Sequence, residues 1–234
     1  MLRRVGKRRS FGADWKLGCT LASVAGAVNA AGFMAVGYYS ANMTGNLSTL
    51  TMALHQHDVA VIGTGIGLIF CFVCGASLAT ILVNAGRRRR LVSVYAWSIL
   101  LEAGLLAALG LDDIFLPGVL REAVLAYGLS FLMGLQNATV TRISDARVRT
   151  THMTGMLTDI GIGIVDSFGG DEAARKTRKR LLLHTSVVMS FALGGTAGAF
   201  LYGSMGGRCL LAFAVVLAVV SVQGIRGRRQ TADL

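Results

Sequence analysis

The sequence predicts an all-helical integral membrane protein whose six transmembrane helices form two three-helix repeats of inverted topology. Three observations predict this fold. The composition is too apolar for a soluble domain, the apolar residues gather in long charge-free runs, and the tripeptide Met-Thr-Gly occurs twice within them. A short apolar segment follows each Met-Thr-Gly, which predicts one half-helix in each repeat.

The composition and the charge-free runs set the class. Hydrophobic residues make up 53% of the 234 residues, charged residues only 15%, and the mean hydropathy is +0.60. A spanning helix needs about 20 apolar residues, and five runs without Asp, Glu, Lys or Arg approach or exceed that length: 17–57, 59–86, 123–141, 181–207 and 209–225. Because these runs do not alternate polar and apolar residues, they exclude the strands of a membrane barrel.

The runs divide into six predicted spans and two shorter segments. The spans, in chain order, are 17–39, 59–86, 91–110, 119–141, 181–203 and 209–225. The segments 44–57 and 154–168 are too short to cross comfortably, at about 14 residues each. We expect both to be re-entrant or interfacial half-helices, the first entering from outside and the second from the cytoplasm, covered by protein or water.

The positive charges predict the orientation. Of the 23 Lys and Arg residues, 21 lie in clusters at 3–16, 87–90, 142–180 and 226–229, which the predicted spans bring to one membrane face. Positively charged segments favour the cytoplasmic side, so both termini are expected there. The net charge of +11 then reflects orientation and does not predict binding to nucleic acid. The basic residues of 169–180 are expected to form a loop that touches anionic headgroups.

These assignments make the chain one membrane domain in four parts. The parts are a basic cytoplasmic arm (1–16), a first three-helix repeat (17–110), a second three-helix repeat (119–225) and a cytoplasmic tail (226–234). An odd number of spans in each repeat places the two copies upside down relative to each other, which is typical of transporters.

The duplication extends beyond Met-Thr-Gly itself, at 43–45 and 153–155. Similar segments occur in the same order around both copies, namely 26–30 with 134–138 upstream and 72–77 with 191–196 downstream. Internal similarity in a fixed order is the signature of a repeated structural unit. We therefore interpret the chain as an internal duplication of one structural unit.

The repeated motifs supply candidate binding residues. Thr44, Gly45 and Asn46, with Thr154 and Gly155, lie where each half-helix is expected to begin. A helix start offers unpaired N–H groups and a partial positive charge to an anion or a polar solute. The alternative is that these residues only cap short helices and bind no ligand.

Asparagines inside the spans are further candidates. Asn29 and Asn137 occupy matched positions upstream of the two motifs. An amide within a membrane span needs partners, so these side chains could bridge helices. Their matched positions also fit a second role, in which they line a site between the repeats.

Two acids are candidates for proton or ion coupling. Glu102 is the only acid deep in a full span. The charged form of a carboxylate is energetically costly there, so an acid at such a position is a candidate functional residue. Alternatively, Glu102 is protonated or paired with Arg121 at the outer end of the next helix. Asp159, with Asp166, lies in the second half-helix and predicts an acidic mouth facing the cytoplasm.

Three stretches carry a family resemblance: Gly-Leu-Gln-Asn-Ala at 134–138, Thr-Thr-His-Met-Thr-Gly-Met-Leu-Thr-Asp at 150–159, and Asn-Met-Thr-Gly-Asn-Leu at 42–47. With them the chain resembles the YoaK family of small bacterial inner-membrane proteins over nearly its whole length. The resemblance implies a six-helix protein of the bacterial inner membrane. The family is a domain of unknown function, so it implies no substrate.

The functional hypothesis is a small-solute secondary transporter or permease, whose polar site is formed by the two half-helix starts with Asn29 and Asn137. The rival is a non-transporting scaffold or regulator whose motifs only cap helices. We expect no enzyme, because no nucleophile and base recur at useful spacing, and no metal or cofactor, because the His residues lack convergent ligands. The expected partners are the bilayer, an unknown small solute and, by fold-level analogy with twelve-helix carriers, a second copy of the chain.

Overall fold

The computed structural model describes residues 10–89 and 94–229, and all regular elements in these residues are α-helices. In chain order they are α1 (Phe11–Val36), α2 (Met43–Gln56), α3 (Val59–Arg88), α4 (Val94–Phe115), α5 (Gly118–Ser144), α6 (Met153–Asp166), α7 (Glu172–Met205) and α8 (Arg208–Arg229). Most of the predicted basic arm (1–9), part of the third predicted span (91–93) and the end of the predicted tail (230–234) lie outside the described residues.

The predicted spans are confirmed by length and composition. Within the described residues, six helices are long and apolar enough to cross a membrane, namely α1, α3, α4, α5, α7 and α8. The other two, α2 and α6, have 14 residues each and begin at Met43 and Met153, the first residues of the two Met-Thr-Gly motifs. The chain is therefore an all-helical, multi-pass membrane protein.

The predicted loop over 169–180 is wrong from Glu172 onward, because α7 already begins there. The Asp171 side chain accepts a hydrogen bond from the Ala174 N–H at 2.9 Å and so caps the helix. Glu172 and Lys176 then form an ion pair at 2.9 Å across one turn. Ala, Lys and Arg are also good helix formers, so charge alone does not make this segment a loop.

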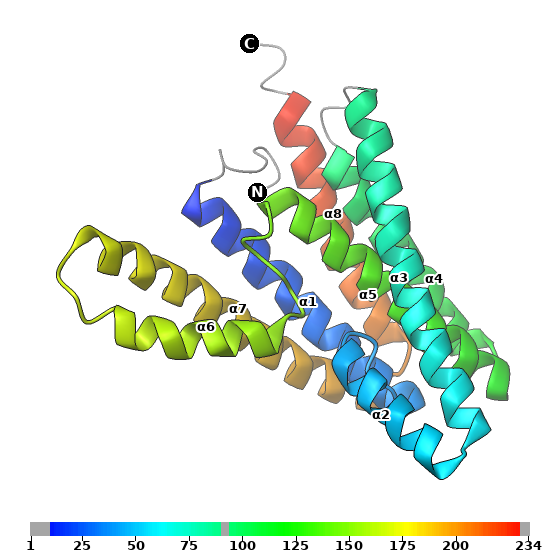
Figure 1. The fold of residues 1–234 in the computed structure, drawn as a ribbon. Coiled ribbons are helices and arrows are strands. Elements are labelled where there is room, and N and C mark those ends of the chain that lie inside the picture. The colour runs from blue at the N-terminus through cyan, green and yellow to red at the C-terminus, as the bar shows by residue number, and fades with distance from the viewer. Residues whose placement is uncertain (1–9, 90–93, 230–234) are drawn as a thin grey trace.

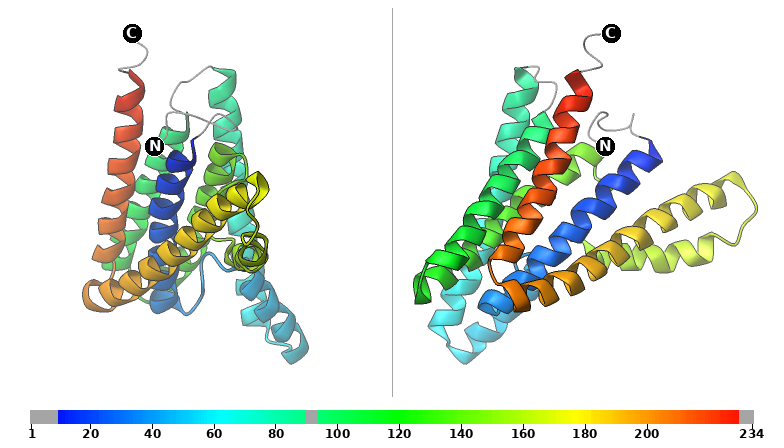
Figure 2. Two further views of the ribbon diagram at one scale, coloured as in Figure 1. Left: turned by 90° about the vertical axis from the view of Figure 1, so that its left-hand side faces the viewer. Right: turned by 180° about the vertical axis from the view of Figure 1, so that it is seen from behind.

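Three helix pairs make the most extensive contacts: α1 with α7, α3 with α5, and α4 with α8. In Figure 1, α6 and the first part of α7 lie side by side and project from the bundle, while α2 lies against α3. The right-hand view of Figure 2 shows the same projecting pair from behind. The outward faces carry large exposed apolar side chains such as Phe70 and Phe200, as expected for helices surrounded by lipid.

Glycine permits the close approach of α1 to α7 and of α3 to α5. At four positions within the repeated segments an added Cβ would overlap a carbonyl oxygen of the facing helix: Gly26 with Phe191, Gly194 with Ser23, Gly134 with Phe72, and Gly75 with Phe131. Small residues at helix interfaces let backbones pack closely in membranes, where dispersion replaces the hydrophobic effect as the driving force. These glycines lie in the segments that the sequence repeats.

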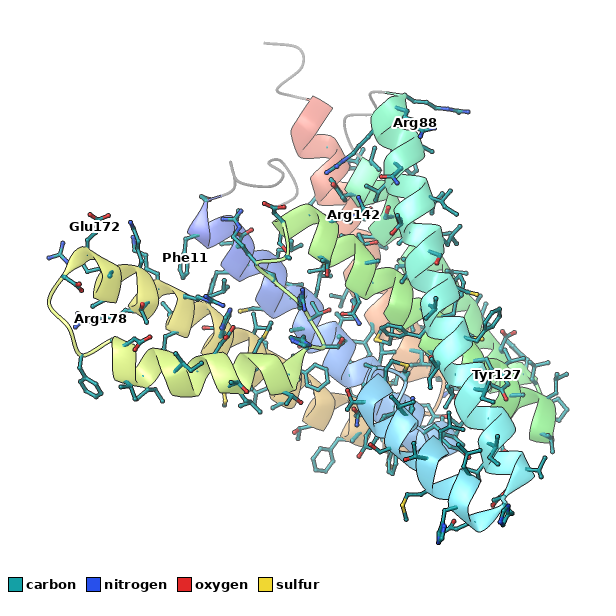
Figure 3. The ribbon with its side chains drawn as sticks, in the orientation of Figure 1. Phe11, Arg88, Tyr127, Arg142, Glu172 and Arg178 are labelled. Carbon is teal, nitrogen blue, oxygen red and sulfur yellow. The ribbon has the colours of Figure 1, made fainter. Side chains whose placement is uncertain are left out.

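The ends of α1, α3, α5 and α8 that carry or adjoin basic residues lie at one end of the bundle, whereas the basic start of α7 lies at the tip of the projecting pair. Arg88 at the end of α3 and Arg142 near the end of α5 lie at that end in Figure 3. The start of α1 and the end of α8 reach the same end in Figure 2. This arrangement agrees with the charge asymmetry on which the predicted orientation depends.

A polar network joins α4, α5 and α7 beside the turn between α4 and α5. Arg121 binds Asp113 at 2.7 Å and donates to the Tyr202 hydroxyl at 3.0 Å. Tyr202 in turn donates to the second Asp113 oxygen at 2.8 Å. The expected alternative in which Arg121 neutralises Glu102 is therefore wrong, because Asp113 lies closer along the connection between the two helices.

Candidate functional site

A cavity of about 550 Å³ lies where the starts of α2 and α6 meet the middle of the bundle. We call it the central cavity. Its lining comes from both halves of the chain and consists of Asn29, Phe72, Asn137, Thr141 and Phe191 on the long helices, with Tyr39, Ala41, Asn42, Met43, Thr44, Arg149, Thr151, His152, Met153 and Thr154 around the short-helix starts. The two motifs, far apart in sequence, thus border one space.

The start of α2 is capped by the residue before its motif. The Asn42 side chain accepts a hydrogen bond from the Gly45 N–H at 3.0 Å. A Cβ at Gly45 would overlap that same Asn42 side chain, so glycine leaves the room that the cap requires. The cap of α2 is therefore Asn42, which was not among the predicted capping residues, while Thr44 lines the central cavity.

The start of α6 differs in its cap. His152 occupies the cap position, and no side-chain cap hydrogen bond forms there. A Cβ at Gly155 would overlap the His152 ring, so the ring lies over the first turn much as Asn42 does in α2. The early N–H groups of a helix lack intrahelical acceptors. Those of α6 thus remain without the side-chain acceptor that Asn42 gives to α2.

Asn29 holds the loop that leads into α2. Its Oδ1 accepts a hydrogen bond from the Ala41 N–H at 2.8 Å, and the residue is 8% exposed. Asn137 does the same for the loop before α6, where its Oδ1 accepts from the hydroxyls of Thr151 at 2.8 Å and Thr150 at 3.3 Å. Both asparagines also line the central cavity, and the hydrogen bonds described above join each of them to a loop and not to a second helix.

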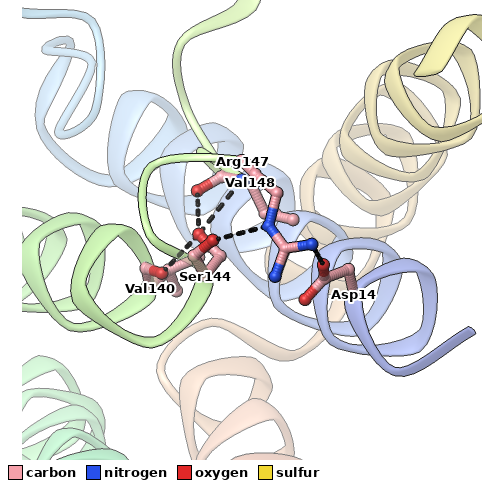
Figure 4. Close-up of polar contacts among 5 residues, drawn as sticks. All are labelled: Asp14, Val140, Ser144, Arg147 and Val148. Carbon is pink, nitrogen blue, oxygen red and sulfur yellow. Dashed lines mark hydrogen bonds and ion pairs between the residues drawn. The ribbon is translucent and has the colours of Figure 1, made fainter. Parts of the chain in front are cut away.

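The loop from α5 to α6 is anchored by side chains on both sides, as Figure 4 shows. The Ser144 hydroxyl has one proton, which the carbonyls of Val140 at 2.9 Å and Val148 at 3.1 Å share, and its oxygen accepts from the Val148 N–H at 3.0 Å. Arg147 donates to the Ser144 carbonyl at 3.1 Å and pairs with buried Asp14 of α1 at 3.2 Å. These contacts hold residues 144–148 in place, and they therefore position the next residues, 149–154, beside the cavity.

A second cavity of about 640 Å³ adjoins the first. Arg149 and His152 line both cavities, so they form part of the wall between them. The second cavity also contains a charged cluster in which Asp159 of α6 binds Arg180 of α7 at 2.9 Å. His184 Nδ1 lies 3.5 Å from the same carboxylate. We call this space the charged cavity.

The structure brings together only part of the predicted site. Of the predicted binding residues, Asn29, Thr44, Asn137 and Thr154 line the central cavity. The other three have separate positions around it: Gly45 lies under the Asn42 cap, Asn46 donates to the Tyr39 carbonyl at 3.0 Å, and Gly155 borders the charged cavity.

The two predicted coupling residues are apart. Asp159 lines the charged cavity, with Arg180 as its partner. Glu102 is fully buried in α4 close to Gln136 of α5, and within the described part of the chain neither of its oxygens has a hydrogen bond of ordinary geometry. It belongs to the lining of neither cavity.

Sequence reasoning missed Arg149, His152, Phe72 and Phe191 as lining residues. Arg149 was counted only as part of a basic cluster that sets orientation. Its position five residues before Thr154 was the available signal, because residues next to a helix break share its surroundings. Phe72 and Phe191 are the first residues of the two similar segments downstream of the motifs, 72–77 and 191–196. Their matched positions could have identified them as a pair.

No metal centre is evident in the described residues, since no three His, Cys, Asp or Glu side chains lie together there. The central cavity instead offers amide, hydroxyl and guanidinium groups, which suit a polar organic or inorganic solute.

Comparison with known proteins identifies the family. The family model described as a protein of unknown function, DUF1275, matches residues 17–223. The chain belongs to this DUF1275 family. It is also similar to the UPF0700 transmembrane protein YoaK of Bacillus subtilis (strain 168), with 26% identity over 169 residues that cover 70% of this chain and 72% of that protein. No solved structure matches. The resemblance to the YoaK family is thus confirmed, and every residue that lines the central cavity lies within the matched residues.

Proposed function

We propose that this DUF1275 protein is a secondary transporter or permease for a small polar solute. The central cavity carries the proposal, because it gathers both Met-Thr-Gly helix starts and both matched asparagines into one space, lined by polar and apolar side chains, among helices long and apolar enough to span a membrane. We further propose that the protein resides in the bacterial inner membrane with both termini in the cytoplasm, as the clustering of its basic residues favours.

The helix contacts support two inverted repeats in which α1 to α4 correspond to α5 to α8. Under this exchange the α1–α7 contact becomes the α5–α3 contact, and α4–α8 maps onto itself. The glycine contacts follow the same rule, since Gly26 against Phe191 corresponds to Gly134 against Phe72. In such folds the substrate site lies near mid-membrane between the repeats, where interrupted helices begin. We therefore propose that α2 and α6 are the half-helices of the two repeats.

The adjoining cavities support a route for the solute. Arg149 and His152 separate the central cavity from the charged cavity, so a small shift of the loop that carries them would join the two spaces. We propose that rocking of one repeat against the other opens the central cavity to alternate sides. The charged cavity, with Asp159 and Arg180, would then be the cytoplasmic mouth.

Coupling and partners follow from the same arrangement. Asp159 is the better-placed coupling candidate, because it borders a cavity, whereas Glu102 would act from the packed interface of α4 and α5. We propose contact of the basic start of α7 with anionic headgroups, and a homodimer by analogy with carriers of twelve helices.

Uptake by proteoliposomes tests the proposal. The purified protein is reconstituted and offered a panel of radiolabelled small polar solutes, and at least one solute is expected to accumulate above protein-free liposomes. Thr154→Trp, which fills the central cavity, is expected to abolish that uptake, because Thr154 lines the cavity. Thr158→Trp is the matched control, since Thr158 is exposed one turn further along α6 and borders neither cavity.

The rival scaffold function predicts a different result. If no solute moves, and cysteines at Thr44 and Thr154 are sealed from water-soluble reagents on both sides of the membrane, the transporter proposal is wrong. The repeated motifs would then serve only to begin α2 and α6.

A further inference from the structure

We propose that the solute of the central cavity is a small anion that bears a carboxylate or another oxyanion group. This inference rests on the proposed function and names the substrate class of the same site. It follows from the hydrogen-bonding character of the lining, which offers donors from several directions and no acidic side chain.

Asn29 supplies a hydrogen-bond donor to the site on the α1 side. Its Oδ1 is engaged by the Ala41 N–H, and because a backbone N–H can only donate, the facing side-chain atom must be the oxygen. The Nδ2 group is therefore the part of the amide that is left to bind a ligand, and it has no hydrogen-bond partner among the described residues. At 8% exposure the side chain is held almost wholly by protein. Because Asn29 lines the central cavity, a ligand oxygen in that cavity can accept a hydrogen bond from this amide.

Asn137 repeats this arrangement on the α5 side. Two threonine hydroxyls, of Thr150 and Thr151, donate to its Oδ1. Its Nδ2 is thereby also left as a donor beside the cavity, without a partner in the described residues. Two amide donors thus face one space from opposite repeats, which suits an acceptor with more than one oxygen.

Arg149 supplies the charge. It lines the central cavity, and within the described part of the chain it has neither an ion pair nor a hydrogen bond, unlike Arg121, Arg147 and Arg180. The lining of the central cavity contains no Asp or Glu, and Asp14, Asp145 and Asp159 of the adjoining charged cavity form no ion pair with Arg149 in the described residues. A guanidinium group binds carboxylate and phosphate oxygens through a planar fork of donors. An unpaired arginine among amide donors therefore selects an anion over a neutral solute.

The two helix starts add to the positive electrostatic potential that Arg149 gives the central cavity. Residues 42–44 of α2 and 152–154 of α6 border the cavity, and helix N-termini carry partial positive charge with N–H groups that lack intrahelical acceptors. At about 550 Å³ the cavity falls within the size range of small-molecule sites. A cation would meet Arg149 and two positive helix ends with no compensating acid.

Protection of a cysteine from alkylation tests the inference. Thr154→Cys is made in a background without Cys19, Cys71, Cys74 and Cys209, and the purified protein is labelled with an uncharged maleimide. Sodium acetate, phosphate, sulfate and chloride are compared at constant ionic strength, with glucose as the neutral control. At an anion concentration about ten times its dissociation constant, labelling should slow about tenfold, because only the unoccupied protein reacts.

Variants of Arg149 locate the effect. Arg149→Gln should weaken protection by about tenfold or more, because hydrogen bonds to a charged group are among the stronger ones. Arg149→Lys should retain part of it, since the charge remains but the fork is lost. Arg142→Gln is the matched control, because Arg142 belongs to the same basic cluster and does not line the central cavity.

The outcomes separate this inference from the proposed function. Rapid labelling that no anion slows, or protection that is equal in Arg149→Gln, overturns the anion assignment and leaves a permease for neutral solutes. Protection by glucose alone does the same. Absence of labelling at both Thr154→Cys and Thr44→Cys means that the cavity is closed to solutes, and the proposed function falls together with the inference.

Discussion

At the scale of single residues, Asn29 and Asn137 explain why the chain repeats an asparagine upstream of each motif. Each uses its carbonyl oxygen to hold the loop before a short helix, and each borders the central cavity. The roles of helix bridge and cavity lining were alternatives in the sequence, because spacing along one helix gives no information on a loop twelve residues away. The structure shows cavity lining together with a bond to the loop, since each loop folds back onto the span that carries the asparagine.

Substitution of Asn29 should separate its two functions. Asn29→Leu removes the acceptor of the Ala41 N–H, and leaving that buried donor unsatisfied should cost about 1–3 kcal/mol. Asn29→Asp keeps an acceptor at the same place, so it should lose less stability, although it adds a negative charge to the cavity. Thermal unfolding of the purified variants in detergent measures the first effect. Equal destabilisation by both substitutions would contradict the assigned hydrogen bond.

At the scale of helices, the structure agrees with the sequence wherever hydrophobic length decides the outcome. The six long helices and the starts of α2 and α6 at Met43 and Met153 were predictable, because membrane thickness dictates span length and glycine and asparagine mark helix breaks. The early start of α7 was not predicted, since a run of charges was interpreted as a loop although its residues favour helix.

The glycine contacts yield a prediction about helix packing. Gly134→Ala places a Cβ onto the Phe72 carbonyl of α3, so the helices must separate, and such overpacking typically costs about 1–3 kcal/mol. Gly104→Ala on α4 is the control, because its Cβ would meet open space. There alanine should be neutral or slightly stabilising, owing to its better helix propensity. Equal melting temperatures for the two variants would show that the α3–α5 contact is looser than described.

At the scale of the whole molecule, the central cavity depends on contacts that sequence reasoning cannot supply. Arg121 was weighed as a partner of Glu102, but it binds Asp113 and Tyr202, and Tyr202 lies 81 residues away on α7. Arg149 lines the cavity only because Ser144 and the Asp14–Arg147 pair fix the loop before it. Duplication in the sequence led to the hypothesis of one polar site formed by both half-helix starts, and both starts border the central cavity in the structure.

The most direct test of the central claim, that one cavity between two repeats opens to alternate sides, is the sidedness of cysteine labelling. Thr44→Cys and Thr154→Cys are treated separately with a membrane-impermeant maleimide in right-side-out and in inside-out vesicles. Because both residues line the central cavity, each cysteine should react from both sides. Reaction of each cysteine from one fixed side only, or of neither from any side, would contradict the account.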